Sequence, residues 1–214
     1  MDGNGCKISG NSDVEINAAG GTVQNVHFEN IHDGATVSDG DKEKYGFSSD
    51  KVGTASALYA SELTGTLTVK DCTFNTCDWE ALQITPKEGA TVNIISNEFK
   101  TADNEQIKEQ LRHIHVEMAY GKGFDCEGEN ITLNINDNKL LGNTKDASLG
   151  VWWVGKESKI DITGNYYQNI DAVSITLSDK TSAWENRCDL VFPARAEKDV
   201  DNDNLSMPIT IIKD

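Results

Sequence analysis

Basic residues are scarce in this chain of 214 residues. Lysine and arginine together number 19 against 35 aspartate and glutamate residues, which gives a formal net charge of −16. A surface this acidic repels phosphate backbones, so we expect no nucleic-acid partner. It also repels anionic membranes and acidic polysaccharides unless a cation intervenes.

Long apolar runs are missing as well. No stretch approaches the roughly 20 apolar residues that a membrane span needs, so we expect no membrane insertion. The first residues, MDGNGCKISGN, lack the basic and apolar regions of a signal peptide. The chain is therefore either cytoplasmic or a monomeric module of a longer secreted protein. The turn-rich start favours the second alternative.

Cysteine is present but follows no metal or redox pattern. The five cysteines are odd in number, and their spacing matches neither zinc-binding nor redox motifs. Cys72 and Cys77 lie within apolar patterns, which predicts buried thiols rather than a disulfide framework. The apolar fraction of 37% is too high for a disordered acidic chain, so we expect a folded body.

An internal repeat determines the expected fold. Five stretches align on an anchor residue, with separations of 46, 25, 41 and 27 residues between successive anchors. The anchors are Phe28, Phe74, Phe99, Leu140 and Tyr167. Aliphatic residues stand five residues before each anchor and, in four copies, seven before it, as in Leu67 and Val69. Alternation of this kind predicts a strand with one buried face.

An asparagine recurs two residues before the anchor. Asn97, Asn138 and Asn165 occupy this position in three successive copies. Buried asparagines at equivalent positions can stack into a ladder in which each amide bonds the copies above and below. The position four residues after the anchor is mostly polar and predicts a turn.

A second strand-like segment follows each anchor, so each copy reads as strand, turn and strand. These segments are SALYAS (56–61), EALQIT (80–85), RHIHVEM (112–118), GVWWVG (150–155) and AVSITLS (172–178). One copy cannot bury both faces alone, whereas stacked copies share a core. We therefore expect an all-β, right-handed parallel β-helix (solenoid) of about five to six coils, folded as a single domain over residues 1–214.

The remaining segments are expected to be caps and insertions. Residues 1–21 form the N-terminal cap or first coil, and 22–183 form the coils. Within the coils, 33–55 is predicted as a long loop and 103–112 as a short helix. Residues 184–214 form a C-terminal cap in which LVF and PITIIK are strands.

The repeat resembles the right-handed parallel β-helix family, the pectin-lyase-like fold, through its VxIxxNxF-type strands and the asparagines at the ladder position. The segments CDWEALQITP, LRHIHVEM and GVWWVG also resemble solenoid modules in large surface proteins and adhesins of gut bacteria. That resemblance implies an extracellular location on a bacterial cell surface and a non-catalytic binding module for a host or community protein or glycan. Host immunoglobulin, bound in the manner of a superantigen, is among the partners it allows.

One face of the solenoid gathers candidate ligand-binding residues. In RHIHVEM, inward Ile114 and Val116 would leave both histidines and Glu117 outward. Outward aromatic side chains stack on sugar rings or anchor protein interfaces. The strand register leaves open whether Trp152 or Trp153 is outward. The predicted ligand-binding residues are Tyr59, Trp79, Gln83, His113, His115, Glu117 and Trp152. His113, His115 and Glu117 could instead hold a metal, although a solvated strand face explains them more simply.

Enzymatic activity is the alternative, as a polysaccharide lyase or glycoside hydrolase of the same fold. The strings NTD, GHG and RIK, which mark its hydrolases, do not occur. Asp78 and Asp171 could form a carboxyl pair, but they share the repeat position of Asp103 and read better as turn caps. Arg112 could act as a lyase base, but no aspartate cluster aligns with it. We therefore expect no catalytic residues and no cofactor.

A possible exception is a weak structural Ca²⁺ site in the tail. Asp199, Asp201 and Asp203 alternate in DVDNDN as in the first half of an EF-hand loop. The twelfth position is Thr210 instead of the bidentate glutamate. A solvated acidic loop is the simpler interpretation.

Overall fold

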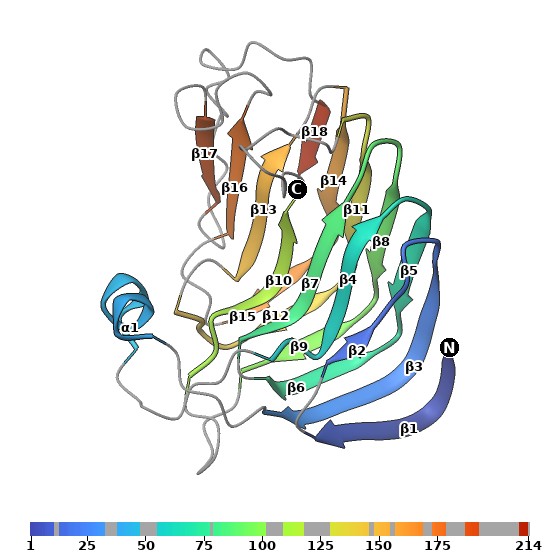
Figure 1. Cartoon of the computed structure of the whole chain (residues 1–214), viewed down its shortest axis with the longest axis vertical. Coiled ribbons are helices and arrows are strands. Elements are labelled where there is room, and N and C mark those ends of the chain that lie inside the picture. The colour runs from blue at the N-terminus through green and yellow to red at the C-terminus, as the bar shows by residue number, and fades with distance from the viewer. Residues whose placement is uncertain are drawn as a thin grey trace.

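The structure, a computed structural model, describes residues 1–10, 13–32, 38–47, 55–77, 79–101, 109–117, 129–145, 148–154, 157–168, 173–178, 187–192 and 210–213. These residues are mostly β, with one helix in the described part, and their strands form two sheets (Figure 1). Every strand pairing is parallel except that of β16 with β17. The predicted all-β, parallel-strand character is confirmed. No helix in these ranges is long and apolar enough to span a membrane.

The larger sheet has eleven strands. In spatial order they are β15 (Tyr166–Gln168), β12 (Lys139–Leu141), β9 (Glu98–Lys100), β6 (Thr73–Cys77), β3 (Gly20–Ile31), β5 (Thr66–Lys70), β8 (Thr91–Ile95), β11 (Thr132–Asn136), β14 (Lys159–Thr163) and β18 (Thr210–Lys213), with β1 (Asp2–Gly10) paired to β3. The 12-residue β3 joins the two halves of this sheet, the strands β15 to β6 and the strands β5 to β18. Its first part pairs with β5 and its second part with β6.

The smaller sheet has seven strands. Their order is β17 (Arg187–Phe192), β16 (Val173–Ser178), β13 (Leu149–Val154), β10 (Arg112–Glu117), β7 (Glu80–Pro86), β4 (Leu58–Leu63) and β2 (Val14–Glu15). The chain follows the same course repeatedly: β5, β6 and β7 are followed by β8, β9 and β10. Each strand of the second set pairs with its counterpart in the first.

The anchor residues lie side by side, as the repeat predicts. Phe28 pairs with Phe74, Phe74 with Phe99, Phe99 with Leu140, and Leu140 with Tyr167. The rings of Phe28, Phe74 and Phe99 stack with centroids 4.8 Å apart. The aliphatic positions five residues earlier are also in register. Stacked copies therefore share one apolar core, which encloses both predicted buried thiols, Cys72 and Cys77.

A left-handed residue turns the chain between the two strand segments of each copy. The residue just before the ladder position has a φ of 52 to 70° in five copies, at Asn25, Asp71, Ser96, Asp137 and Gly164. Asparagine, aspartate and glycine are the residues that adopt this conformation at least cost. The turn places the next side chain inside the bend, which is where the asparagines stand.

The predicted asparagine ladder is present. The Nδ2 of Asn97 donates to Asn138 Oδ1, and that of Asn138 to Asn165 Oδ1, both at 3.0 Å. Each amide also donates to a backbone carbonyl, for example Asn138 to Ile94 at 2.8 Å. Asn97 and Asn138 are almost completely buried. The ladder thus satisfies polar groups at a bend that the core covers.

The structure tests the loop predicted over 33–55 and the helix predicted over 103–112. The loop predicted over 33–55 is wrong in part, because α1 (Asp39–Tyr45) lies inside it. Ser38 caps this helix by accepting a hydrogen bond from the Asp41 amide at 3.1 Å, and left-handed Gly46 ends it. Residues 109–111 are not helical and β10 begins at Arg112, so the end of the helix predicted over 103–112 is wrong; residues 102–108 lie outside the described ranges.

The two strands predicted in the C-terminal segment are confirmed. LVF falls in β17 and ITIIK contains β18. β17 pairs antiparallel with β16 at one end of the smaller sheet, and β18 pairs with β14 at one end of the larger sheet.

Candidate functional site

The smaller sheet presents an inner and an outer face along β4, β7, β10 and β13. Leu58, Leu82, Ile114 and Leu149 form an inner row of core residues in register. The next residue on each strand points the other way, which gives an outer row of Tyr59, Gln83, His115 and Gly150. Four of the seven predicted ligand-binding residues, Gln83, His115, Glu117 and Trp152, lie together on this outer face, with Tyr59 at its β4 side.

Trp152 is the aromatic centre of the outer face. It is partly exposed, pairs in register with Glu117, and lies edge-on to the His115 ring with centroids 4.7 Å apart. The guanidinium carbon of Arg112 lies 4.4 Å from the centroid of its ring, within cation–π range. The register that places Trp152 outward and Val151 in the core is therefore the observed one; the side chain of Trp153 is outside the described set.

Gly150 explains this close packing. A Cβ at this position would lie 3.3 Å from both Arg112 Cδ and Trp152 Nε1. That distance is tight, so any larger residue would push the guanidinium and the indole apart. Glycine therefore lets Trp152 lie across the strand against Arg112.

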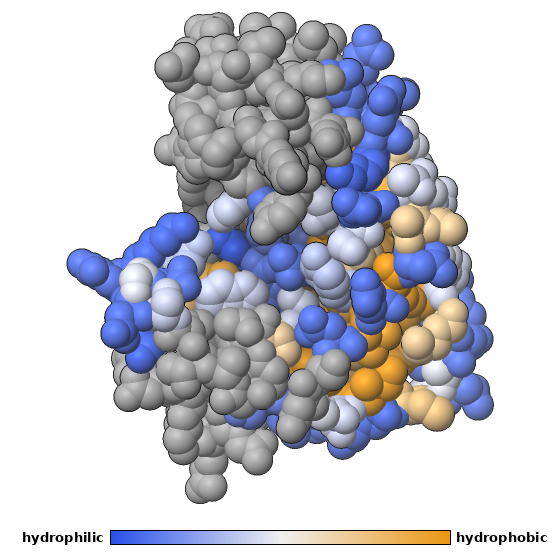
Figure 2. All heavy atoms as spheres, viewed as in Figure 1, coloured by the Kyte–Doolittle hydropathy of each residue, from blue (hydrophilic) through white to orange (hydrophobic). Residues whose placement is uncertain are grey.

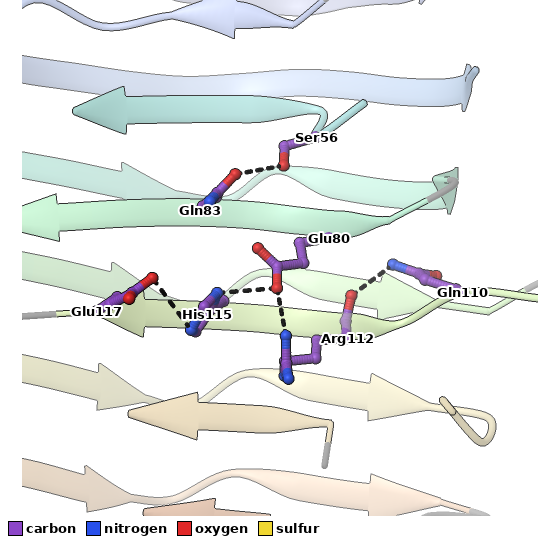
Figure 3. Close-up of polar contacts among 7 residues, drawn as sticks. All are labelled: Ser56, Glu80, Gln83, Gln110, Arg112, His115 and Glu117. Atoms are coloured by element: carbon purple, nitrogen blue, oxygen red, sulfur yellow. Dashed lines mark hydrogen bonds and ion pairs between the residues drawn. The ribbon is translucent and has the colours of Figure 1, made fainter. Parts of the chain in front are cut away.

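Four ionisable residues under Trp152 form a buried charge cluster (Figure 3). Its members are Glu80, Arg112, His115 and Glu117, each less than 9% exposed. Glu80 Oε1 lies 2.6 Å from Arg112 Nη1 and 2.8 Å from His115 Nδ1. On the other side of the imidazole, His115 Nε2 lies 3.9 Å from Glu117 Oε2. Charges this far from water persist only when paired.

The two carboxyl groups of the cluster have their pKa values displaced in opposite directions. Burial alone would raise the pKa of Glu80, but its contacts with His115 and Arg112 outweigh burial and hold the pKa below its ordinary value. Burial raises the pKa of Glu117, and the attraction of His115 offsets this only in part. Glu80 is therefore the firmly ionised member of the cluster, and Glu117 is the one that takes up a proton more readily.

His113 is not on the outer face, so this part of the prediction is wrong. The amides of His113 and Ile114 both donate to the Ser148 carbonyl, at 3.0 Å, which breaks the alternation of the strand. His113 is fully buried, with its ring 6.2 Å from that of Phe99 and its Nε2 2.8 Å from Thr101 Oγ1. Burial lowers its pKa to about 3, so it is neutral.

That orientation also removes the proposed His113–His115–Glu117 metal site. Within the described ranges no group of three or more histidine, cysteine or acidic side chains is arranged to hold a metal. The predicted calcium ligands Asp199, Asp201 and Asp203 lie outside those ranges, as do Asp78 and Asp171.

Trp79 belongs to an aromatic cluster beside the site. Its ring centroid is 5.9 Å from that of Phe47 and 6.1 Å from that of Tyr45, and Leu111 completes the group. These contacts hold the end of the α1 segment against the residues that directly precede β7 and β10, and Figure 1 shows the helix itself standing off from the strands. Tyr45 reaches the site, with its ring centroid 5.7 Å from the Arg112 guanidinium carbon.

Among the described residues, the surface in view is mostly polar, and its apolar residues gather around β2, β4 and β5 (Figure 2). Val14 and Ile16 are partly buried against the core at this end of the stack. The buried charge cluster lies instead on β7 and β10, so it is separate from this apolar patch.

Sequence reasoning missed Glu80, Tyr45 and the role of Gly150, and considered Arg112 only as a lyase base. A signal for the ion pair exists, because Glu80 and Arg112 each open a strand segment and pair in register. A glutamate and an arginine at the same repeat position of adjacent copies predict a cross-strand contact. No comparable pattern places Tyr45, which comes from an insertion.

Comparisons with known proteins assign no relative. No protein-family model matches the chain, and neither a curated protein nor a solved structure is significantly similar to it. The function is therefore argued from the geometry of the chain itself.

Proposed function

We propose that the chain is a right-handed parallel β-helix of about five to six coils and serves as a non-catalytic binding module. The register of the five anchors, the asparagine ladder and the repeated three-strand course support the solenoid. A rigid stack of this kind presents side chains from successive strands at fixed spacing, which suits recognition.

The ligand binds the outer face of β7, β10 and β13. The observation that carries this proposal is the half-buried Trp152, held against Arg112 and His115 on a face that also offers Gln83 and Glu117. An indole whose orientation is fixed by its neighbours provides contact area at little entropic cost. Gln83 and Trp152 are the partly exposed residues of this face, whereas the guanidinium of Arg112 is buried and already engaged by Glu80.

The partner is a host or microbial glycan or protein, and host immunoglobulin is one protein to be tested. The net charge of −16 favours an uncharged or basic ligand over an anionic one. We place the module on a bacterial cell surface, as a monomeric part of a longer adhesin-like chain.

Removing the indole tests the proposal. The wild-type protein is screened on a glycan array and by pull-down from mucosal secretions, and each hit is measured again with Trp152→Ala. The matched control is Tyr166→Ala, which removes an aromatic ring that is 55% exposed on the other sheet. We expect at least one ligand whose affinity falls tenfold or more in Trp152→Ala and is unchanged in the control. Equal binding by both variants would contradict the proposal.

A glycan-active enzyme is the second candidate, and one observation favours it. The pKa values of Glu80 and Glu117 are displaced in opposite directions within one cluster, which is the arrangement of an acid–base pair. Product release is screened on plant, host and microbial polysaccharides, with and without Ca²⁺. Turnover that Glu117→Gln abolishes would establish an enzymatic function. If no polysaccharide is turned over, the binding module remains the supported function.

A further inference from the structure

His115 lies between two carboxyl groups in the buried charge cluster. Its Nδ1 is 2.8 Å from Glu80 Oε1 on β7, and its Nε2 is 3.9 Å from Glu117 Oε2 on its own strand. His115 is 4% exposed, and within the described residues neither ring nitrogen makes a well-aligned hydrogen bond, so the contact of Nδ1 with Glu80 is an ion-pair contact. Figure 3 shows the imidazole between the two side chains.

The positions of the two carboxyl groups favour one proton between His115 and Glu117. Because Glu80 is ionised, Nδ1 carries hydrogen and faces it. Nε2 then carries hydrogen only in the imidazolium form. In the neutral form its lone pair faces Glu117, and two lone pairs repel unless the Glu117 carboxyl is protonated. The buried pair therefore avoids this repulsion while it holds one proton on either group.

The other groups around His115 are one carboxylate, one guanidinium and several side chains without formal charge. β7 contributes Glu80 and uncharged Gln83, β10 contributes Arg112, β13 contributes Gly150 and Trp152, and Tyr45 reaches Arg112. With the shared proton the cluster is neutral, because Glu80 and Glu117 together balance Arg112 and His115. Without it the cluster has a net negative charge in a site almost closed to water, which is costly.

Glu117 is the group that can relieve this cost. Its side chain is 10% exposed, the highest fraction among the carboxyl groups and His115 of the cluster, so it lies nearest to solvent. It pairs in register with Trp152, and a movement of Glu117 toward water would change the surroundings of the indole. Burial raises the pKa of Glu117, which has the sign expected if the site favours its protonated form.

We propose that one proton shared by His115 and Glu117 controls the Trp152 face. The face is formed while the proton is bound. As the pH rises, the proton is lost and Glu117 turns toward solvent. Ligand affinity then falls, by at most about tenfold per pH unit, the limit for one proton. The effect on ligand affinity rests on the proposed function, whereas the proton-linked change itself needs no ligand.

The test uses the ligand-free protein. Tryptophan emission is titrated between pH 5 and 8, and the signal of Trp152 is obtained by subtracting the titration of Trp152→Phe. We expect a single-proton transition in the wild type that is absent in Glu117→Gln, whose amide can donate to Nε2 of the neutral imidazole. The control Glu98→Gln alters an exposed carboxylate on β9 and should keep the transition.

Two results would overturn the inference: no Trp152-dependent transition in the wild type, or an unchanged transition in folded Glu117→Gln. The proton NMR signals of His115 provide a second measurement should Glu117→Gln melt early. If the transition is present but no ligand of the Trp152 face is found, the proposed function fails and this inference stands. If a ligand is found and its affinity is independent of pH, this inference fails and the proposed function stands.

Discussion

At the residue scale, the buried ion pair between Glu80 and Arg112 is the most consequential contact. Both side chains are 1–2% exposed, and the pair supports Trp152 from below. Position in the repeat could have predicted their proximity, but not their burial. One of the residues beside Arg112, Tyr45, comes from an insertion, and an insertion has no repeat partner from which its place can be inferred.

Truncating one partner of this pair should therefore be costly. Arg112→Ala leaves the Glu80 carboxylate buried and uncompensated, so we expect a loss of about 3–5 kcal/mol in the free energy of unfolding. The control Lys139→Ala breaks an exposed pair with Glu98, 3.6 Å apart, and should cost less than about 1 kcal/mol. Urea unfolding measures both; similar small losses would show that the cluster is open to water.

His113 predicts how stability responds to acid. Its pKa is about 3 in the folded protein against 6.5 for an ordinary histidine. As the pH falls below 6.5 the unfolded chain binds a proton that the folded chain refuses, so stability is lost down to about pH 3. Between pH 6.5 and pH 4 this amounts to about 3 kcal/mol.

A substitution isolates this contribution from that of the carboxyl groups. His113→Leu should flatten the dependence of unfolding free energy on pH between 7 and 4, whatever it does to stability at neutral pH. His27→Gln, which alters an exposed histidine, should keep the wild-type slope. An unchanged slope in His113→Leu would mean that the buried imidazole is protonated in the fold.

At the element scale, the bends between strand segments were the most predictable feature. The asparagines recur at a fixed distance from the anchor, and only a buried stack gives an amide at that position a consistent role. The helix α1 was missed although its start, Ser38 followed by Asp39 and Asp41, has the usual capping residues. The glycines in this segment favoured the prediction of a loop. In addition, a helix of only seven residues gives a weak sequence signal.

The ladder gives a prediction for the bends. In Asn138→Ala the amides of Asn97 lose their acceptor and the Ile94 carbonyl loses its donor, all of them buried. We expect a loss of about 3 kcal/mol or more. The control Asn136→Ala, two residues earlier on the outer side, removes bonds to Asp161 and Thr163 and should cost about 1 kcal/mol. Thermal unfolding compares the two, and equal losses would argue against a structural role for the ladder.

At the scale of the whole molecule, the sequence period predicts which strands pair and which residues form the core. Every anchor pair follows from it, because copies that are alike in sequence bury their equivalent residues together. The face around Trp152 was predicted in outline only. The orientation of its side chains depends on a local irregularity at His113 and on a glycine at position 150. Neither is a property of the repeat.

The most direct measurement is amide hydrogen exchange of the protein with and without a ligand captured in the screen. The account predicts slower exchange in peptides covering 80–86, 112–117 and 149–154, and no change in 91–95, which lies in the other sheet. Protection confined to the larger sheet or to the apolar patch around β2 and β4 would contradict it.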